Sequence, residues 1–252
     1  MPRFAANLSM LFRELPLPER FAAAASAGFE AVEILFPYDD PTPALRRGLI
    51  ASGLPLVLIN TPPPNWTGGA RGFAAIPGAQ DRFRHDFKRV LRYAEQLRPR
   101  HIHIMAGAAS GDDARSTFIE NLSWAAQTAP NQSLTIEPIN TTDMPGYFLD
   151  DFDLAADILD QVGAPNLHLQ FDAYHAHRMT GDVMATWKRH ASQVVHIQVA
   201  GAEGRHEPVK GAIDYPAFFA LLDETGYCGF VSGEYDPKTI TTEGLGWIAP
   251  RP

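Results

Sequence analysis

The sequence predicts a closed barrel of eight parallel strands, each followed by a helix, built as one domain over residues 1–252. Eight short apolar or alternating segments are separated by longer segments of helical character, and this alternation is typical of parallel α/β folds. The length of 252 residues also suits one such barrel, which usually takes about 250 residues. No G-x-G-x-x-G motif follows the first expected strand, which disfavours an open dinucleotide-binding sheet.

The expected strands are short runs in which apolar residues are continuous or alternate with polar ones. The series opens with RFAANLSM and AVEILFP, and the later runs, such as LHLQFDAYH and VVHIQVAG, alternate more strictly. Continuous runs are typical of strands buried on both faces, and alternation indicates a polar row opposite an apolar one. The eight runs cover residues 3–10, 31–37, 54–61, 101–107, 133–140, 167–175, 194–201 and 229–236.

Segments with helical periodicity lie between these strands. The last of them is opened by Asp214, a residue type that caps helix N-termini, and closed by Gly226, a residue type that ends helices. The expected helices cover residues 17–27, 81–97, 112–129, 150–162 and 214–225.

The Pro/Gly-rich segment 61–78 reads as a long loop after the third strand. In a barrel this connection lies on the catalytic face, so one interpretation is a lid whose Trp66 and Phe73 cover a ligand. The other interpretation is a loop packed on the barrel rim. Residues and length do not distinguish the two.

Composition and charge narrow the class of protein. Hydrophobic residues make up 45% of the chain, which is enough for a globular core. The formal net charge of −8 argues against a nucleic-acid or anionic-membrane partner. No stretch has the length of a membrane span or the pattern of a signal peptide. Cys228 is the one cysteine and is interpreted as a structural thiol, so we expect a reducing, cytoplasmic location.

Alternation within the last four strands points a polar row away from the helices. Because the row that faces the helices must be apolar, the polar row points into the barrel, and its last members lie near the carboxyl ends of the strands, where barrel enzymes place their chemistry. These last members are Glu137, Asp172, Gln198 and Glu234. Four oxygen-bearing side chains are therefore expected to converge.

Three carboxylates in a partly dry pocket repel one another unless something neutralises them. A divalent cation does so, and carboxylates with one amide oxygen form a hard, all-oxygen ligand set that favours Mg²⁺ or Mn²⁺. The alternative is a metal-free pair of carboxylic acids kept protonated by raised pKa values. Each carboxylate on its own has a further interpretation, as a helix cap or the partner of an arginine.

Several motifs together resemble the hydroxypyruvate isomerase family of the xylose-isomerase-like barrels. They are the opening RFAANLSMLF, FPYD at 36–39, IEPIN at 136–140, FDAYH at 171–175, HIQVAG at 196–201, GRHEP at 204–208 and GEYDP at 233–237. The resemblance runs to GLGW at 244–247, which is essentially the whole chain. It implies a xylose-isomerase-like (β/α)₈ barrel.

The resemblance also implies a ligand set for a divalent metal: Glu137, Asp172, Gln198 and Glu234, one after each of strands five to eight. These are the residues that the alternation points inward. The related ketose 3-epimerases usually carry His at the strand-seven position, so Gln198 favours the hydroxypyruvate isomerase branch.

The activity implied by the resemblance is the interconversion of hydroxypyruvate and 2-hydroxy-3-oxopropanoate (tartronate semialdehyde). This reaction needs a proton acceptor, a proton donor and a positive centre beside the developing oxyanion. Glu137 and Glu234 suit the acid/base pair, although the residues do not say which is the base, nor do they separate proton transfer from a hydride shift.

Two residues are expected to bind the substrate. The resemblance assigns His175 to substrate oxygens; the alternative is a loop histidine with an internal partner. Arg205 suits the substrate carboxylate because a guanidinium binds it with two parallel hydrogen bonds; the alternative is a surface ion pair with Glu203 or Glu207. His101 and His103 on strand four, and Asn7, Glu33 and Asn60 near the ends of strands one to three, receive no role.

Other functions remain open beside this one. A 2-oxotetronate isomerase would use the same metal and bases. The segment EPINTTDMPGY at 137–147 is more similar to the hydroxypyruvate enzymes, so hydroxypyruvate is the first candidate substrate. A ketose 3-epimerase follows, and then a non-catalytic barrel that binds sugar acids, against which the two glutamates argue. The charge of −8 opposes an endonuclease. We expect a short 2-oxo sugar acid as the partner, and the family suggests dimers or tetramers.

Overall fold

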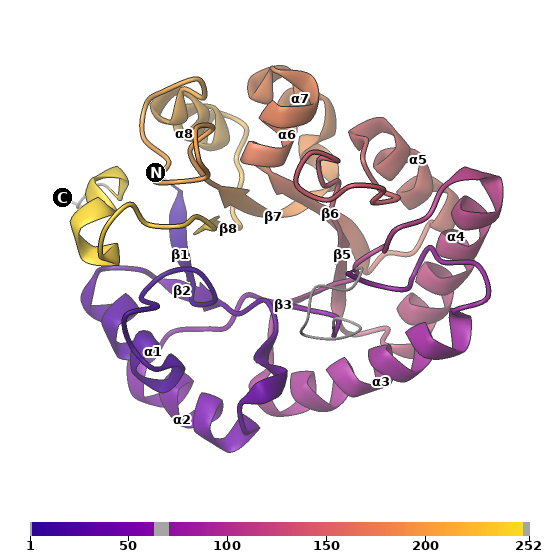
Figure 1. Cartoon of the computed structure of the whole chain (residues 1–252), viewed down its shortest axis with the longest axis horizontal. Helices are drawn as coiled ribbons and strands as arrows, with labels where there is room; N and C mark the ends of the chain where they lie inside the picture. Colours follow the sequence, from indigo (N-terminus) through magenta and orange to yellow (C-terminus); the bar gives the residue numbers. More distant parts are fainter. Residues whose placement is uncertain (1, 63–70, 249–252) are drawn as a thin grey trace.

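The computed structural model describes residues 2–62 and 71–248, and in them a barrel of parallel strands is surrounded by helices (Figure 1). The strands are β1 (Arg3–Asn7), β2 (Ala31–Glu33), β3 (Leu58–Asn60), β4 (His101–His103), β5 (Ser133–Ile136), β6 (Leu167–Asp172), β7 (Val194–Val199) and β8 (Phe230–Gly233). Their hydrogen-bonded order is β2-β1-β8-β7-β6-β5-β4-β3. A parallel bridge between Val32 and Leu56 joins the two ends of this order. The predicted (β/α)₈ barrel is confirmed.

The helices lie outside the strands, as Figure 1 shows. They are α1 (Leu17–Ser26), α2 (Thr42–Ser52), α3 (Gln80–Leu97), α4 (Gly111–Thr128), α5 (Phe152–Val162), α6 (Ala173–Thr180), α7 (Val183–His190) and α8 (Tyr215–Glu224), with short 3₁₀ helices at Pro37–Asp39, Ala191–Gln193 and Thr241–Trp247. The five helices expected from the sequence are confirmed, with ends shifted by at most three residues.

Three helices, α2, α6 and α7, are not identified by the periodicity. In α2, Pro43 lies in the first turn, where proline is tolerated, and Gly48 lies in the middle, where glycine is normally unfavourable. A Cβ at Gly48 would run into the ring of Phe21, so the absence of a side chain lets α2 pack against α1. Local sequence alone does not reveal this packing.

The sixth strand is shorter than predicted, because it ends at Asp172 rather than at residue 175. The Asp172 carboxylate accepts a hydrogen bond from Tyr174 N–H at 2.7 Å, and this cap starts α6 directly at the strand end. His175 therefore lies in the first turn of a helix. The cap also fixes the direction of the Asp172 side chain.

The two rows of side chains face as the alternation predicts. Phe171 of β6 packs against Trp187 of α7 and Phe218 of α8, with ring centroids 5.6 and 6.0 Å apart. The alternate residues Gln170 and Asp172 make polar contacts inside the barrel. The helices and the apolar row thus form the main core, and the barrel interior is polar at its carboxyl end.

The connection before α3 is described from Arg71 onward, so Trp66 lies outside the described residues. Gly72, with φ +100°, pairs with Ala106, and Ala75 N–H donates to the Ala106 carbonyl at 2.7 Å. Phe73 is half-buried, with the Arg82 guanidinium 5.0 Å from its ring centroid. This part of the connection is packed against the exit of β4, as the rim interpretation expects.

Two further features concern the rest of the molecule. Cys228, the residue interpreted as a structural thiol, is exposed just before β8. The turn that carries it is at the surface, where its Sγ lies 3.2 Å from the carbonyl oxygen of Gly226. None of the helices within residues 2–62 and 71–248 has the length and apolar content needed to cross a bilayer.

Candidate active site

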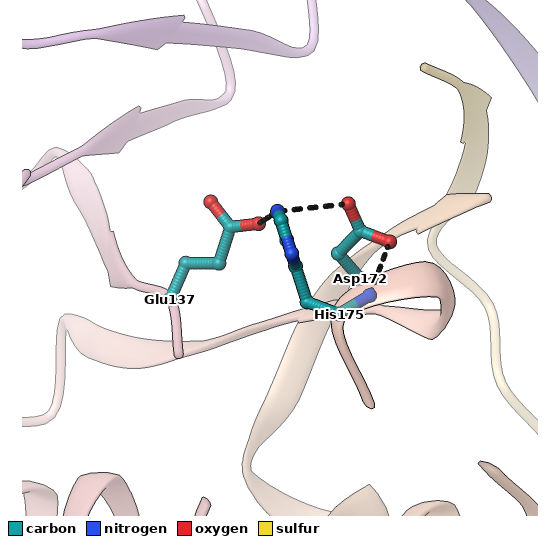
Figure 2. Close-up of side chains that lie close together, drawn as sticks. All are labelled: Glu137, Asp172 and His175. Carbon is teal, nitrogen blue, oxygen red and sulfur yellow. Dashed lines mark hydrogen bonds and ion pairs between the residues drawn. The ribbon is translucent and has the colours of Figure 1, made fainter. Parts of the chain in front are cut away.

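Glu137, Asp172 and His175 meet at the carboxyl ends of β5 and β6 (Figure 2). His175 Nε2 lies 3.6 Å from Asp172 Oδ2 and 4.0 Å from Glu137 Oε1. One ligand atom from each residue lies within 4.8 Å of the others, and all three side chains are buried. Such a spacing suits a bound cation. The sequence predicted Glu137 and Asp172 as ligands and His175 as a substrate contact, and the position of His175 is compatible with either role.

The two carboxylate oxygens of Asp172 have different roles. Oδ1 caps α6, and Oδ2 faces His175 Nε2 and, at 3.4 Å, Arg205 Nη2. Because the cap holds one oxygen, the other is presented to the pocket in a fixed direction. Asp172 is completely buried, so its second oxygen needs a cationic or donor partner, and Arg205 is one.

Arg205 connects Glu234, which follows β8, to this cluster. Its Nη2 lies 3.3 Å from Glu234 Oε2 as well as 3.4 Å from Asp172 Oδ2, and its guanidinium lies 5.1 Å from the ring centroid of Tyr174. Its backbone has φ +54°, a conformation that non-glycine residues rarely adopt. Arg205 thus pairs inward, with the site carboxylates, rather than with Glu203 or Glu207.

Burial sets the protonation of the two glutamates. It raises the pKa of Glu137 well above its usual value, and the charges of Glu234 and Asp172 raise it further. Burial also raises the pKa of Glu234, to about 8, against the opposing effect of Arg205. Without an added cation, Glu234 therefore exchanges its proton near neutral pH, and Glu137 also holds its proton more tightly than an exposed glutamate does. Burial lowers the pKa of His175, in spite of Asp172, which favours a neutral ring able to accept a hydrogen bond.

Gln198, the fourth predicted ligand, belongs to a polar layer beneath the cluster. Its Oε1 accepts a hydrogen bond from Gln170 Nε2 at 2.7 Å, and the same Nε2 donates to Glu137 Oε2 at 3.0 Å. Gln198 is thus connected to Glu137 through Gln170. Its other end donates to Glu33 Oε1 at 2.9 Å.

The sequence argument assigned no role to several members of this layer. Glu33, His103, Gln170 and His196 are all buried with polar contacts inside the barrel. The alternation had already pointed Gln170 and His196 inward. It could not give their partners, because contacts such as His196 with Glu33 join strands that are far apart in the chain.

A pocket of about 540 Å³ opens above the cluster. Glu137, His175, Arg205 and Glu234 line it, together with apolar residues such as Met105 and further polar ones such as Asn60. Arg71, which the sequence argument did not single out, also lines it. Small-molecule sites commonly measure about 300–1,000 Å³, so this volume admits acids of three or four carbons.

Comparisons with known proteins identify the family of the chain. Residues 21–251 match the family model described as xylose isomerase-like TIM barrel. A 2-oxo-tetronate isomerase of Cupriavidus necator is 47% identical, over 99% of this chain and 98% of that protein. The hydroxypyruvate isomerase of Escherichia coli is 39% identical, over 99% of each chain.

A solved structure, described as AP endonuclease, family 2, from Brucella melitensis, superposes with a TM-score of 0.95 at 43% identity, over 99% of each chain. The chain therefore belongs to the xylose isomerase-like TIM barrel family, and within it to the isomerases that include hydroxypyruvate isomerase and 2-oxo-tetronate isomerase.

Proposed function

We propose that this isomerase interconverts hydroxypyruvate and 2-hydroxy-3-oxopropanoate. The observation that carries the proposal is the pair of buried glutamates, Glu137 and Glu234, on the wall of one pocket beside Arg205. Burial raises the pKa of both glutamates, and the value of about 8 for Glu234 suits proton transfer near neutral pH. A second candidate substrate is 2-oxotetronate, which the 47% identical relative favours.

The chemistry assigned to the glutamates is a proton transfer between adjacent carbons. One deprotonated glutamate removes a proton from the hydroxymethyl carbon of hydroxypyruvate, and the electron pair forms an enediolate with the neighbouring carbonyl carbon. Return of a proton to the former carbonyl carbon, with transfer of the hydroxyl proton to the former carbonyl oxygen, gives the aldehyde. Atoms balance, because the two acids are isomers.

The site suits a divalent metal, Mg²⁺ or Mn²⁺. Glu137, Asp172 and Glu234 supply carboxylates in a buried site, Gln198 supplies an amide oxygen, and this donor set fits a hard cation. When bound, the metal would neutralise the carboxylates and stabilise negative charge on substrate oxygens. His175 offers a nitrogen within the same cluster.

Substrate binding is assigned to Arg205 and His175. The Arg205 guanidinium presents a planar fork for the substrate carboxylate, and stacking on Tyr174 holds its plane. His175 Nδ1 is 2.7 Å from the amide nitrogen of Asn140, which leaves Nε2 directed at the cluster. The partner is thus a short 2-oxo sugar acid. From the single cysteine and the sequence pattern we also propose a cytoplasmic location, and from the family resemblance a homo-oligomer.

Turnover of both acids by purified protein tests the proposal. We expect hydroxypyruvate to be converted faster than 2-oxotetronate, and EDTA to abolish both activities until Mg²⁺ or Mn²⁺ is restored. Faster turnover of 2-oxotetronate would select the second candidate. Activity that survives thorough metal removal would leave Glu137 and Glu234 as a metal-free pair.

The same assay run in deuterated water separates two mechanisms. Proton transfer through a glutamate incorporates solvent deuterium at carbon 2 of the product, whereas a hydride shift between the carbons does not. No turnover of either acid, with neutral ketoses converted instead, would indicate a ketose 3-epimerase. Tight binding without any conversion would indicate a sugar-acid binding barrel.

A further inference from the structure

Glu33 lies at the end of β2 and is completely buried beneath the pocket, although no role in the reaction has been assigned to it. Its Oε2 lies 2.6 Å from His196 Nε2. Its Oε1 accepts hydrogen bonds from Asn7 Nδ2 at 2.8 Å and from Gln198 Nε2 at 2.9 Å. Three donors from β1 and β7 therefore converge on one carboxylate. A carboxylate offers acceptors only, so it dictates which end of each neighbour faces it.

This contact fixes the direction of Gln198. With its NH₂ group facing Glu33, its Oε1 faces the opposite side and accepts from Gln170 Nε2 at 2.7 Å. If Gln198 were reversed, its oxygen would face the Glu33 carboxylate and its NH₂ group would face the NH₂ group of Gln170. Both contacts would be repulsive, and all three side chains are buried, where an unpaired polar group is costly.

Gln170 connects the oriented side chain of Gln198 to the proposed metal site. Gln170 Nε2 donates both to Gln198 Oε1 and to Glu137 Oε2, while its Oε1 accepts from Thr135 Oγ1 at 3.1 Å. A chain of hydrogen bonds thus runs from Glu33 through Gln198 and Gln170 to Glu137. The carboxylate at each end of it accepts. An amide oxygen has two lone pairs, so Gln198 Oε1 can accept from Gln170 and still bind a cation.

We infer that Glu33 is a positioning residue, which holds the oxygen of Gln198 toward the cation site through a directed chain of hydrogen bonds. The inference rests on the proposed metal site. Partners that orient metal ligands typically change metal affinity by roughly 10–100-fold when removed. A purely structural Glu33, which only pairs with His196, would affect stability and leave metal affinity unchanged.

Mn²⁺ binding to the metal-stripped whole chain, followed by calorimetry, tests this inference. In Glu33→Gln the new side chain has both a donor and an acceptor, so Gln198 is free to reverse. We expect Mn²⁺ to bind this variant about 10–100-fold more weakly. Glu30→Gln is the matched control: the same substitution on the surface, where Glu30 pairs with Arg3 at 3.1 Å, should keep the affinity within about twofold of the original chain.

A double-mutant cycle shows whether Glu33 acts through Gln198. In the Gln198→Ala background there is no oxygen to orient, so adding Glu33→Gln should weaken Mn²⁺ binding no further. Multiplying effects in the double variant would overturn the inference, as would a single Glu33→Gln variant with unchanged Mn²⁺ affinity. If Glu33→Gln does not fold, Glu33→Asp takes its place. Asp keeps the negative charge, but its shorter side chain moves the carboxylate away from Gln198. The same results for Mn²⁺ affinity then support or overturn the inference.

The proposed function can fail separately in this experiment. If the original chain binds no Mn²⁺, the metal site itself is wrong, and Glu33 has no ligand to position. If the original chain binds Mn²⁺ and the variants bind it equally well, the metal site stands and only the role of Glu33 is overturned.

Discussion

Glu137 and Glu234 approach one pocket from β5 and β8, and burial gives both a raised pKa. Replacing either with Gln keeps the size of the side chain and removes its ability to exchange a proton. Loss of general acid–base catalysis usually costs roughly 10²–10⁴-fold in rate. We therefore expect Glu137→Gln and Glu234→Gln each to lower kcat by such a factor, in steady-state assays with saturating metal.

Substrate binding separates catalysis from simple loss of the pocket. Calorimetric titration with a non-reacting hydroxy acid should still show binding to both Gln variants, because Arg205 remains. Variants that turn over normally would exclude these glutamates as the acid/base pair.

Glu234 also predicts a pH dependence of stability in the metal-free protein. Its pKa of about 8 lies above its ordinary value of 4.5, so the folded state holds its proton more tightly than the unfolded state does. The stabilisation is complete below pH 4.5 and is lost as the pH rises toward 8. The slope for one proton is at most about 1.4 kcal/mol per pH unit.

Denaturant unfolding in EDTA between pH 6.5 and pH 8 measures this loss. The buried His101 and His103 have pKa values lowered to about 3, so both are neutral in the folded protein. The protons that they take up on unfolding add the same slope to the original chain and to Glu234→Gln, so this slope cancels in the comparison. The original chain should lose stability relative to Glu234→Gln as the pH rises. Parallel curves for the two proteins would show that Glu234 does not hold a proton in the folded state.

Among the connecting elements, the segment before α3 depends on a close backbone approach. Gly72 has φ +100°, and a Cβ there would run into the carbonyl oxygen of Met105. We expect Gly72→Ala to destabilise the fold, with about 1–3 kcal/mol from backbone strain and more from the collision. Because Arg71 is the preceding residue and lines the pocket, KM should also rise.

Gly78→Ala is the matched control in the same connection. Gly78 has φ +80°, so it shares the unfavourable backbone conformation, but nothing lies within 4 Å of an added Cβ. Its loss of stability, measured by denaturant unfolding, should be smaller than that of Gly72→Ala, and its KM unchanged. Equal losses would mean that the contact with Met105 is not tight.

The strands show what sequence patterns can and cannot predict about this site. Alternation with a period of two was sufficient to point Glu137, Asp172, Gln198 and Glu234 inward, because one face of each strand must meet the helices. It could not predict that Asp172 is both the last residue of β6 and the N-cap of α6. The residues after Asp172 fit the end of a strand as well as the start of a helix.

Contacts across the barrel were beyond the sequence for a different reason. The register between β6 and β7 shifts between Leu169 and Gln170, and only this shift places Asp172 opposite Gln198. The contact of Glu33 with His196 joins residues 163 positions apart. Such partners depend on closure of the whole barrel, whereas residue patterns report one strand at a time.

For the whole molecule, metal binding and folding are linked. A ligand that binds only the folded state adds about 2.7 kcal/mol at a concentration 100 times its Kd. For a chain of this size that corresponds to an increase of roughly 5–10 °C in Tm. We expect Mg²⁺ or Mn²⁺ to raise Tm in thermal unfolding of the metal-stripped protein. The increase should be strongly reduced in Glu137→Gln, and an equal increase there would place the ion elsewhere.

The position of Cys228 allows one spin label to be attached at a known place, away from the pocket. It is exposed just before β8, whereas Glu234 follows the same strand at the opposite end. Six residues of extended chain span about 20 Å. A nitroxide attached to this single thiol therefore stands on the far side of the barrel, clear of the pocket mouth. Magnetic dipolar coupling between that label and Mn²⁺ would measure the distance from the label to the ion in solution, without altering any residue of the pocket.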